Sequence, residues 1–399
     1  MTSLSTADPS TAEISDLDVE PPEGSGIEVE PPVVYDGIVI EPPPDDSFMD
    51  PAGYFSEKLF DLEMRVVYPR SWVFVGDLSQ LRKPGDYVTE TIGTEPVMVV
   101  RGRDGTLRAF VNVCPHRAST LVEGSGNCGR ALVCPYHGWT FHLDGRLAAT
   151  PHPRGFVEPV DRGAYGLREV RVDVWLQFVF VNVSGDAPPL HEWLHPAPEQ
   201  FARHNLEAAT RVYELDDEVN ANWKVMMDNA FCDYHLEFVH SNTLGRFADA
   251  STLREDIWEY TGRLTSQWSD EQLARTDVLP ALAETNSYGS VAFGVFPNWF
   301  IAAFPNGGCS LMWWNPISLD KSRARVWNYS PDPDADARSD FEMLKAVQAE
   351  DYAICEKVQQ GLRSRSYRPG PQHYLELRVC GHQRRLMKML ADAIRRGDG

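Results

Sequence analysis

The sequence lacks several features that would place it in other classes of protein. No run approaches the roughly 18 apolar residues that a membrane-spanning helix needs. The N-terminus has neither the basic segment nor the apolar segment of a secretory signal. Cysteines number only seven among 399 residues, and an odd number in a long chain is not typical of a disulfide framework. We therefore expect a soluble cytoplasmic protein with reduced thiols, a minority of which bind metal.

Basic residues are absent from residues 1–50, which hold thirteen acidic ones. Removing these thirteen leaves 45 acidic against 37 basic residues in the rest of the chain, so most of the formal charge of −21 belongs to this segment. The acidic balance argues against non-specific binding of nucleic acid and against docking on anionic membranes. Three similar Pro-rich acidic segments, 19–22, 29–32 and 40–43, predict a disordered leader over residues 1–50, which either solubilises the protein or serves as a docking tail.

The remainder of the chain divides into two regions with different sequence patterns. Residues 51–187 show short runs rich in Val, Phe and Thr between glycine turns, which predicts a small antiparallel β domain. Residues 188–399 mix helical and strand patterns, which predicts a second domain and an α+β fold class. Its expected helices cover 222–240, 338–362 and 373–395, and its expected strands cover 291–304, 309–317 and 323–329.

Two short cysteine–histidine segments give the strongest functional signal. Cys114 and His116 are followed, after seventeen intervening residues, by Cys134 and His137. Two thiolates and two imidazoles on two tight loops make a four-ligand metal site. Zinc could take all four ligands, whereas a Rieske [2Fe–2S] cluster would take the cysteines on one iron and the histidines on the other. Each loop carries one ligand of each kind and can reach both irons, which favours the cluster; Cys128, between the loops, is interpreted as a spare thiol.

The segments 112–117 and 134–139 resemble the Rieske motif of the α subunits of ring-hydroxylating oxygenases, and the resemblance extends from about residue 55 to the C-terminus. It implies a small antiparallel Rieske domain over 51–187. It also implies a helix-grip catalytic domain over 188–399, with an antiparallel sheet and a mononuclear non-haem iron(II). A homotrimeric ring of α subunits, reduced by a ferredoxin or a flavin reductase, is implied as well.

His235 and His240 are the candidate histidine ligands of this second iron. On a regular helix, residues five apart point about 140° away from each other. The two can bind one iron only if the helix loosens or ends between them. The segment from residue 222 to His240 resembles the catalytic helix of the family, and that resemblance implies a catalytic role for Asn229.

The third ligand should be a carboxylate, because two histidines and one Asp or Glu leave positions open for dioxygen. Asp351 falls within an apolar stripe of the helix expected at 338–362. A carboxylate on a core-facing stripe is costly unless it is paired or bound to metal. We therefore expect Asp351 to be the third ligand, with a helix-capping or salt-bridged acid as the alternative; its neighbour Glu350 is interpreted as solvated.

One position departs from the family. The family has an acidic residue three before the first histidine, which links the Rieske domain of one subunit to the iron of the next. Here that position is Cys232, and the nearest acid is Asp233. On a regular helix Asp233 points away from His235 by about 160°. Either a local irregularity re-aims Asp233, which we expect to be the link, or electrons take another route.

Two further groups of residues are less specific. Tryptophans on the expected sheet could form a wall or a cage for a cationic ligand, but core packing is the favoured interpretation; they are Trp299, Trp313, Trp314 and Trp327. A basic cluster on the last helix is interpreted as a solvated face, which an acidic ferredoxin could use; it comprises Arg378, Arg384, Arg385 and Lys388.

These features predict a terminal oxygenase. It would use O2 and electrons from a reductase or ferredoxin to hydroxylate, or oxidatively dealkylate, a small organic substrate, either aromatic or a methylated amine. Two alternatives stay open at this point. One is a Rieske electron-transfer protein without oxygenase activity, which needs only Cys114, His116, Cys134 and His137. The other is a zinc-stabilised binding protein.

Overall fold

The computed structural model describes residues 32–44, 46–246, 250–274, 276–283, 289–334 and 338–398. Its first sheet has seven strands, and every neighbouring pair is antiparallel. In spatial order the strands are β3 (Val73–Asp77), β12 (Phe178–Asn182), β11 (Glu169–Trp175), β6 (Leu107–Val111), β5 (Glu95–Arg101), β4 (Asp86–Ile92) and β7 (Ser125–Asn127). This is the antiparallel β domain that the short Val- and Phe-rich runs predict.

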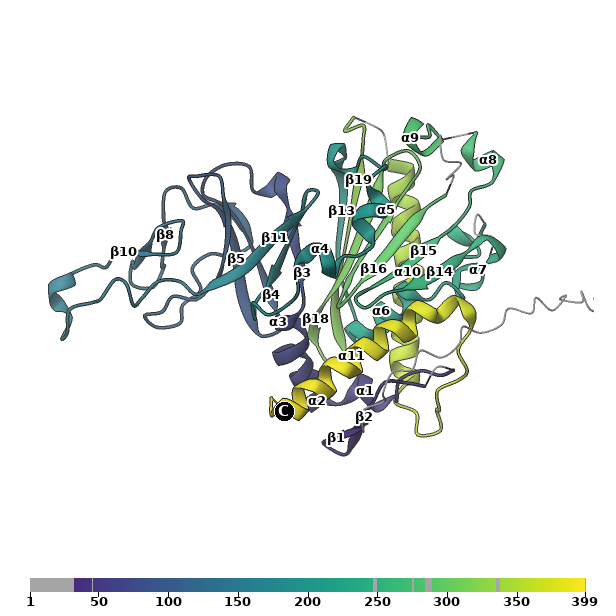
Figure 1. Cartoon of the computed structure of the whole chain (residues 1–399), viewed down its shortest axis with the longest axis horizontal. Coiled ribbons are helices and arrows are strands. Elements are labelled where there is room, and N and C mark those ends of the chain that lie inside the picture. Colours follow the sequence, from purple (N-terminus) through teal and green to yellow (C-terminus); the bar gives the residue numbers. More distant parts are fainter. Residues whose placement is uncertain are drawn as a thin grey trace, which may run out of the picture. The chain divides into compact units, whose positions relative to one another are not determined.

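A smaller sheet carries one of the two cysteine–histidine loops. Its strands are β10 (Leu147–Ala149), β9 (Thr140–Phe141) and β8 (Leu132–Val133). The segment Cys134–His137 connects β8 to β9, while the segment Cys114–His116 follows β6 of the larger sheet. In Figure 1, β8 and β10 extend from one end of the larger sheet.

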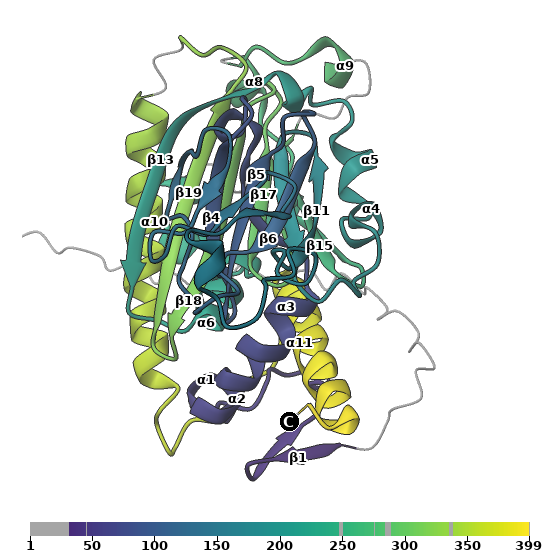
Figure 2. The same ribbon diagram turned by 90° about the vertical axis from the view of Figure 1, so that its left-hand side faces the viewer.

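The second large sheet is also antiparallel and has helices packed against it. Its seven strands are, in spatial order, β13 (Thr210–Val219), β19 (Lys321–Ser330), β18 (Cys309–Ser318), β17 (Trp299–Ala303), β16 (Val291–Val295), β15 (Thr261–Thr265) and β14 (Arg254–Ile257). Helices that contact it include α6 (Trp223–Phe231), α10 (Arg338–Gly361), α11 (Leu377–Arg396) and the short α5 (Ala197–Phe201). Figure 2 shows α10 alongside β13. The α+β class and the sheet-plus-helix catalytic domain are confirmed.

Short helices connect these elements. They are α1 (Ala52–Phe55), α2 (Glu57–Leu62), a π-helical turn (Glu63–Val67), α3 (Tyr68–Arg70), α4 (Leu190–Trp193), α5 (Ala197–Phe201), α7 (Leu236–Val239), α8 (Asp270–Leu273) and α9 (Pro280–Ala283). Single 3-10 turns cover Leu78–Gln80, Pro153–Gly155, Leu206–Ala208, Leu244–Arg246, Ala250–Thr252 and Tyr374–Glu376. None of the described helices combines the length and the apolar character that crossing a bilayer requires.

Aromatic side chains of the two predicted domains pack against one another in the larger of two core clusters. The Phe74 ring on β3 lies edge-on to Trp313 at a centroid distance of 5.0 Å and stacks on Trp299 at 5.8 Å. Trp327 also meets Phe74, edge-on at 5.6 Å. These indoles lie on the face of the second sheet that turns away from α10. They pack as core, as the favoured interpretation had it, in a cluster of buried residues that draws on both sides of residue 187.

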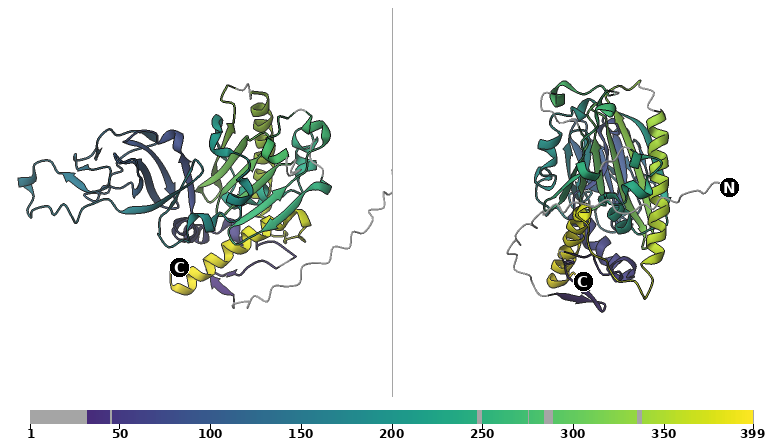
Figure 3. Two further views of the ribbon diagram at one scale, coloured as in Figure 1. Left: turned by 45° about the horizontal axis from the view of Figure 1, so that its top comes forward. Right: turned by 90° about the vertical axis from the view of Figure 1, so that its right-hand side faces the viewer.

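Part of the acidic leader is folded. Residues 33–40 form a hairpin of β1 (Val33–Tyr35) and β2 (Ile38–Ile40) that contacts α11 (Figure 3), and Ile40 is fully buried. Arg384 of α11 donates hydrogen bonds to the carbonyls of Pro43 and Pro44. The prediction of disorder is therefore wrong for 32–44 and 46–50, because composition alone does not show that α11 offers this segment apolar contacts and donors. Residues 1–31 lie outside the described residues.

Candidate metal centres

The side chains of His235, His240 and Asp351 converge. His240 Nε2 lies 3.2 Å from His235 Nε2 and 3.1 Å from Asp351 Oδ1. His235 Nε2 lies 3.4 Å from the same carboxylate oxygen. In the part of the chain that the structure describes, this is the one group of three or more potential ligand atoms that all lie within 4.8 Å of one another. The sequence-predicted triad is thus brought together in space.

A break in the catalytic helix aims the two histidines at one point. Helix α6 ends at Phe231, and Cys232 has an extended backbone with φ −91° and ψ 124°. The short helix α7 then runs between the two ligands, with His235 at its N-terminal cap and His240 at its C-terminal cap. The single helix expected over 222–240 is therefore two helices. The interruption that two histidines five residues apart require is present.

Asp351 is held as a carboxylate by its surroundings. It lies on α10, and 14% of its side chain is exposed. Burial raises its pKa, but interactions with the neighbouring imidazoles of His235 and His240 outweigh burial and lower the pKa to about 2. Asn229 of α6 donates a hydrogen bond from Nδ2 to Asp351 Oδ1 at 2.9 Å. Asn229, implicated by resemblance, thus contacts the third ligand and fixes its orientation.

Glu350 orients His240, and its interpretation as a solvated residue is wrong. His240 Nδ1 lies 2.8 Å from Glu350 Oε2, and Thr243 Oγ1 donates to the same oxygen at 2.6 Å. A carboxylate on Nδ1 keeps the proton there and leaves Nε2 free to bind metal. Position on a helix alone did not reveal this contact, because His240 and Thr243 reach Glu350 from the α7 region. The donor set of two imidazoles and one carboxylate fits a mononuclear non-haem iron with open positions.

Asp233 lies in a buried ion pair, and among the described residues none of its hydrogen bonds or ion pairs reaches the side chains of the triad. Its Oδ2 accepts a hydrogen bond from Arg378 Nη2 at 2.7 Å, and Glu255 Oε1 lies 3.5 Å from Arg378 Nε. Burial raises the pKa of Glu255 to about 8, against the lowering effect of Arg378. Arg378 is therefore not part of a solvated face: its side chain is fully buried because it compensates two acids that come from other elements.

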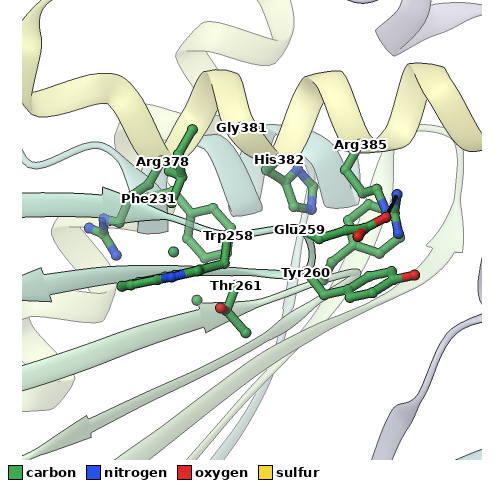
Figure 4. A pocket seen from close by; sticks show the side chains of 13 residues that line it. Phe231, Trp258, Glu259, Tyr260, Thr261, Arg378, Gly381, His382 and Arg385 are labelled. Atoms are coloured by element: carbon green, nitrogen blue, oxygen red, sulfur yellow. Dashed lines mark hydrogen bonds and ion pairs between the residues drawn. The ribbon is translucent and has the colours of Figure 1, made fainter. Parts of the chain in front are cut away.

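Two hollows lie near this ion pair. The one in Figure 4, between α11 and the strands β14 and β15, measures about 20 Å³, which is room for one water rather than a substrate. A larger hollow of about 200 Å³ is lined by Asp233 and by three exposed aromatic residues. These are Tyr234, Phe238 and Tyr374, with 50, 74 and 63% of their surface exposed.

The two cysteine–histidine loops have the same backbone geometry. In each loop the cysteine carbonyl accepts a hydrogen bond at 3.0 Å from the amide four residues later, at Ala118 or Gly138. Both residues have positive φ, 58° and 70°, so each loop is a tight turn closed on its cysteine. Glycine suits such a conformation, and an alanine there is strained. Two matching turns from separate strands thus present the four predicted donors.

The four donors have two distinct environments. The thiols of Cys114 and Cys134 are buried, whereas the imidazoles of His116 and His137 are half-buried. The two imidazole rings lie 4.7 Å apart between centroids. Burial raises the pKa of Cys134, but amides of the loop outweigh burial and lower it. The four ligand atoms do not gather within 4.8 Å, although all four are described. That spread fits a two-iron cluster with thiolates on one iron and imidazoles on the other, and not a single zinc.

Known proteins combine the same two centres. A family model described as "Ring hydroxylating alpha subunit (catalytic domain)" matches residues 206–392, and a "Rieske [2Fe-2S] domain" model matches residues 71–166. The oxygenase subunit of carnitine monooxygenase from Acinetobacter pittii is 31% identical over 330 residues, which cover 79% of this chain and 85% of that protein. The large oxygenase component of the naphthalene 1,2-dioxygenase system from Pseudomonas putida is 35% identical over 196 residues, 47% of this chain and 43% of that one.

The solved structure of the quaternary ammonium Rieske monooxygenase CntA with L-carnitine has the same fold, with a TM-score of 0.75 at 24% identity over 86% of this chain and 95% of that chain. Fold and ligand sets together define an oxygenase whose cofactors are a Rieske [2Fe–2S] cluster and a mononuclear iron. The chain belongs to the ring-hydroxylating α-subunit family of Rieske non-haem iron oxygenases.

Proposed function

We propose that this chain is the terminal oxygenase component of a system that oxidises a methylated ammonium compound. The observation that carries the proposal is the presence of two complete ligand sets in one chain, one on the Rieske loops and one at the triad. A Rieske electron carrier needs only the first set, and a zinc-stabilised binding protein needs a single convergent site. Neither alternative explains why His235, His240 and Asp351 converge.

In this proposal each ligand has a defined place. Cys114 and Cys134 hold one iron of the cluster, and His116 and His137 hold the other. His235, His240 and Asp351 hold the mononuclear iron. When bound, the cluster supplies electrons and the iron(II) activates dioxygen. The chain itself binds and orients the substrate. Asn229 holds the orientation of Asp351, and Glu350 holds that of His240.

The reaction balances as a monooxygenation. A C–H bond of the substrate, O2, two electrons and two protons give a C–OH bond and one water. If the hydroxylated carbon carries a nitrogen, its C–N bond then breaks to leave an amine and a carbonyl compound. Similarity to a carnitine monooxygenase subunit over 79% of the chain supports a methylated ammonium substrate, whereas similarity to the naphthalene dioxygenase component covers 47%.

The assembly and the electron supply form part of the same proposal. A ferredoxin or a flavin reductase delivers electrons in the cytoplasm to a homotrimer, in which they cross from the cluster of one subunit to the iron of the next. Inter-subunit electron transfer has been described for a quaternary ammonium Rieske monooxygenase of the same fold. Asp233, beside the exposed aromatic residues of the 200 Å³ hollow, is the proposed crossing point. Neither nucleic acid nor a membrane is a partner.

Product analysis tests the activity. The purified protein, reduced through a ferredoxin reductase system under O2, is offered L-carnitine, glycine betaine, choline and naphthalene. We expect an amine and a carbonyl compound, in equal amounts, from at least one methylated ammonium. Naphthalene diol with no ammonium oxidation would contradict the substrate class, and a protein that contains zinc but no sulfide would contradict the oxygenase itself.

The crossing point is tested by Asp233→Asn, which keeps the size of the side chain and an acceptor for Arg378. We expect re-oxidation of the reduced cluster by substrate and O2 to slow at least about tenfold, while the cluster spectrum stays unchanged. Asp256→Asn is the control, because Asp256 pairs with Arg263 on the surface strands β14 and β15. Unchanged re-oxidation in Asp233→Asn would require a different route.

A further inference from the structure

One buried amide of α10 lies close to the triad without a strong partner. Gln348, one turn before Asp351, is 3% exposed. Its Nε2 donates to the thioether sulfur of Met312 at 3.5 Å, and no other hydrogen bond of this side chain is found among the described residues. A thioether is a weak acceptor. A buried amide with so poor a partner is costly unless something else pairs with it.

The sheet face that Gln348 meets is not fully covered. Ser310 and Met312 lie two residues apart on β18, so their side chains point to the same face. Ser310 pairs with Ala302 of β17 and with Asn328 of β19. These are inner strands of the sheet, yet Met312, Ala302 and Asn328 remain only half-buried. The Oδ1 atom of Asn328 is buried and has no hydrogen-bond partner. Solvent-accessible space therefore remains on the face of these inner strands that meets α10, beside the unpaired Oδ1 atom of Asn328.

Contacts along α10 give the order of these groups. Phe341 stacks on Tyr213 at a centroid distance of 4.4 Å, and Tyr213 pairs with Asn328 across β13 and β19. Asn328 is thus level with the N-terminal part of α10. Gln348 follows, and Asp351 lies about 4.5 Å further along the helix axis at 1.5 Å per residue. A molecule in this space would run from the triad past Gln348 toward Asn328.

We infer that Gln348 binds an oxygen atom of the substrate and so selects small molecules that carry a hydroxyl or carboxylate group at the end remote from the triad. This inference rests on the proposed function, because it places the substrate between the triad and the sheet. A carboxamide N–H donates to an oxygen acceptor. A quaternary ammonium group has no lone pair, so the N–H of Gln348 cannot donate a hydrogen bond to it. That end of the substrate lies toward the triad, where oxidation next to nitrogen takes place.

Isothermal titration calorimetry on the holoprotein tests the inference without turnover. Four probes differ in their oxygen groups: L-carnitine carries a hydroxyl and a carboxylate, glycine betaine a carboxylate, choline a hydroxyl, and tetramethylammonium no oxygen. We expect at least one oxygen-bearing probe to bind the wild-type protein at least about tenfold more tightly than tetramethylammonium. In Gln348→Leu we expect that probe to lose about 10- to 100-fold in affinity and tetramethylammonium to change less than twofold.

The variant Gln348→Glu identifies the oxygen group. The added negative charge weakens L-carnitine and glycine betaine much more than choline if a carboxylate is bound, and the hydroxyl probe keeps its affinity if a hydroxyl is bound. Visible spectra and iron content show that each variant retains both centres, and Gln360→Leu, on the exposed side of α10, is the matched control. Equal losses for oxygen-bearing and oxygen-free probes in Gln348→Leu, no loss at all, or no discrimination by the wild-type protein overturns the inference. Selective binding without any product would instead overturn the proposed function and leave the inference standing.

Discussion

The two metal centres of this chain are built in opposite ways. The proposed Rieske ligands all lie between residues 114 and 137, on two turns that close through their own backbone hydrogen bonds. The ligands of the triad come from the α6–α7 break and from α10, more than a hundred residues later, and meet only when these helices pack together. The first centre depends on local backbone geometry, whereas the second depends on tertiary packing. Changes in the catalytic domain should therefore disturb the triad while leaving the cluster intact.

The largest expected effect comes from the cluster ligand Cys134. In Cys134→Ser we expect the visible spectrum of the cluster and all product to be lost, because a hydroxyl is a poor ligand for iron in such a cluster. The triad should still hold one iron per chain, measured as iron in the absence of acid-labile sulfide. Cys128→Ser is the control: Cys128 only donates to the Gly85 carbonyl, so its spectrum should be that of the wild type. Loss of the triad iron in Cys134→Ser would show that the centres are not independent.

The complementary experiment removes Asp351, the proposed third ligand of the mononuclear iron. In Asp351→Ala we expect iron content to fall by one atom per chain and product to fall to background, because two imidazoles alone hold iron weakly. The cluster should keep its spectrum and its rate of reduction. If Asp351→Ala still turns substrate over, the third ligand is another residue.

Much of this contrast was predictable from the sequence, and the part that was not has a physical cause. The four candidate Rieske ligands could be proposed from the spacing of two short motifs, because the geometry of such loops is local. His235 and His240 could be proposed from the resemblance of their segment to the family's catalytic helix, and Asp351 from a helix stripe. Glu350 was misjudged because its partners, His240 and Thr243, belong to a distant segment.

Arg378 was misjudged in the same way, since the acids that justify its burial lie on β14 and after α6. The folded part of the leader, 32–44 and 46–50, could not be predicted either. Its composition is that of a disordered segment, and only the surface of α11 supplies partners for Ile40 and for the carbonyls of Pro43 and Pro44.

A smaller effect should follow from Glu350, which orients a ligand without binding the metal. In Glu350→Gln we expect iron affinity of the triad and product formation to fall about 10- to 100-fold, because the amide orients the imidazole less strongly than the carboxylate. Iron retention during dialysis against a chelator measures the affinity. Glu342→Gln, an exposed acid on the same helix, should behave as the wild type. Wild-type retention in Glu350→Gln would mean that packing alone positions His240.

The smallest effect concerns stability rather than activity and probes the packing on which the triad depends. Asp228, one residue before Asn229, accepts hydrogen bonds from Tyr54 and Gln383. Burial raises its pKa from 3.8 to about 7, so between these values the folded state holds a proton that the unfolded state has lost. This contribution to the free energy of unfolding is fully present below pH 4 and is lost as pH rises through 7.

The side chain in Asp228→Asn is neutral at every pH, so the free energy of unfolding of this variant should not show the loss that the wild type shows as pH rises. Its free energy of unfolding relative to the wild type should therefore rise by about 1.4 kcal/mol per pH unit over this range, a few kcal/mol in total. Urea unfolding from pH 4.5 to 7.5 measures the difference. Asp144→Asn is the control: Arg146 lowers the pKa of Asp144, so this carboxylate is ionised in both states above pH 4.5 and the difference from the wild type should stay constant. A constant difference between wild type and Asp228→Asn would show that Asp228 is ionised in the folded protein, and that α6 is held against Tyr54 by a charge rather than by a shared proton.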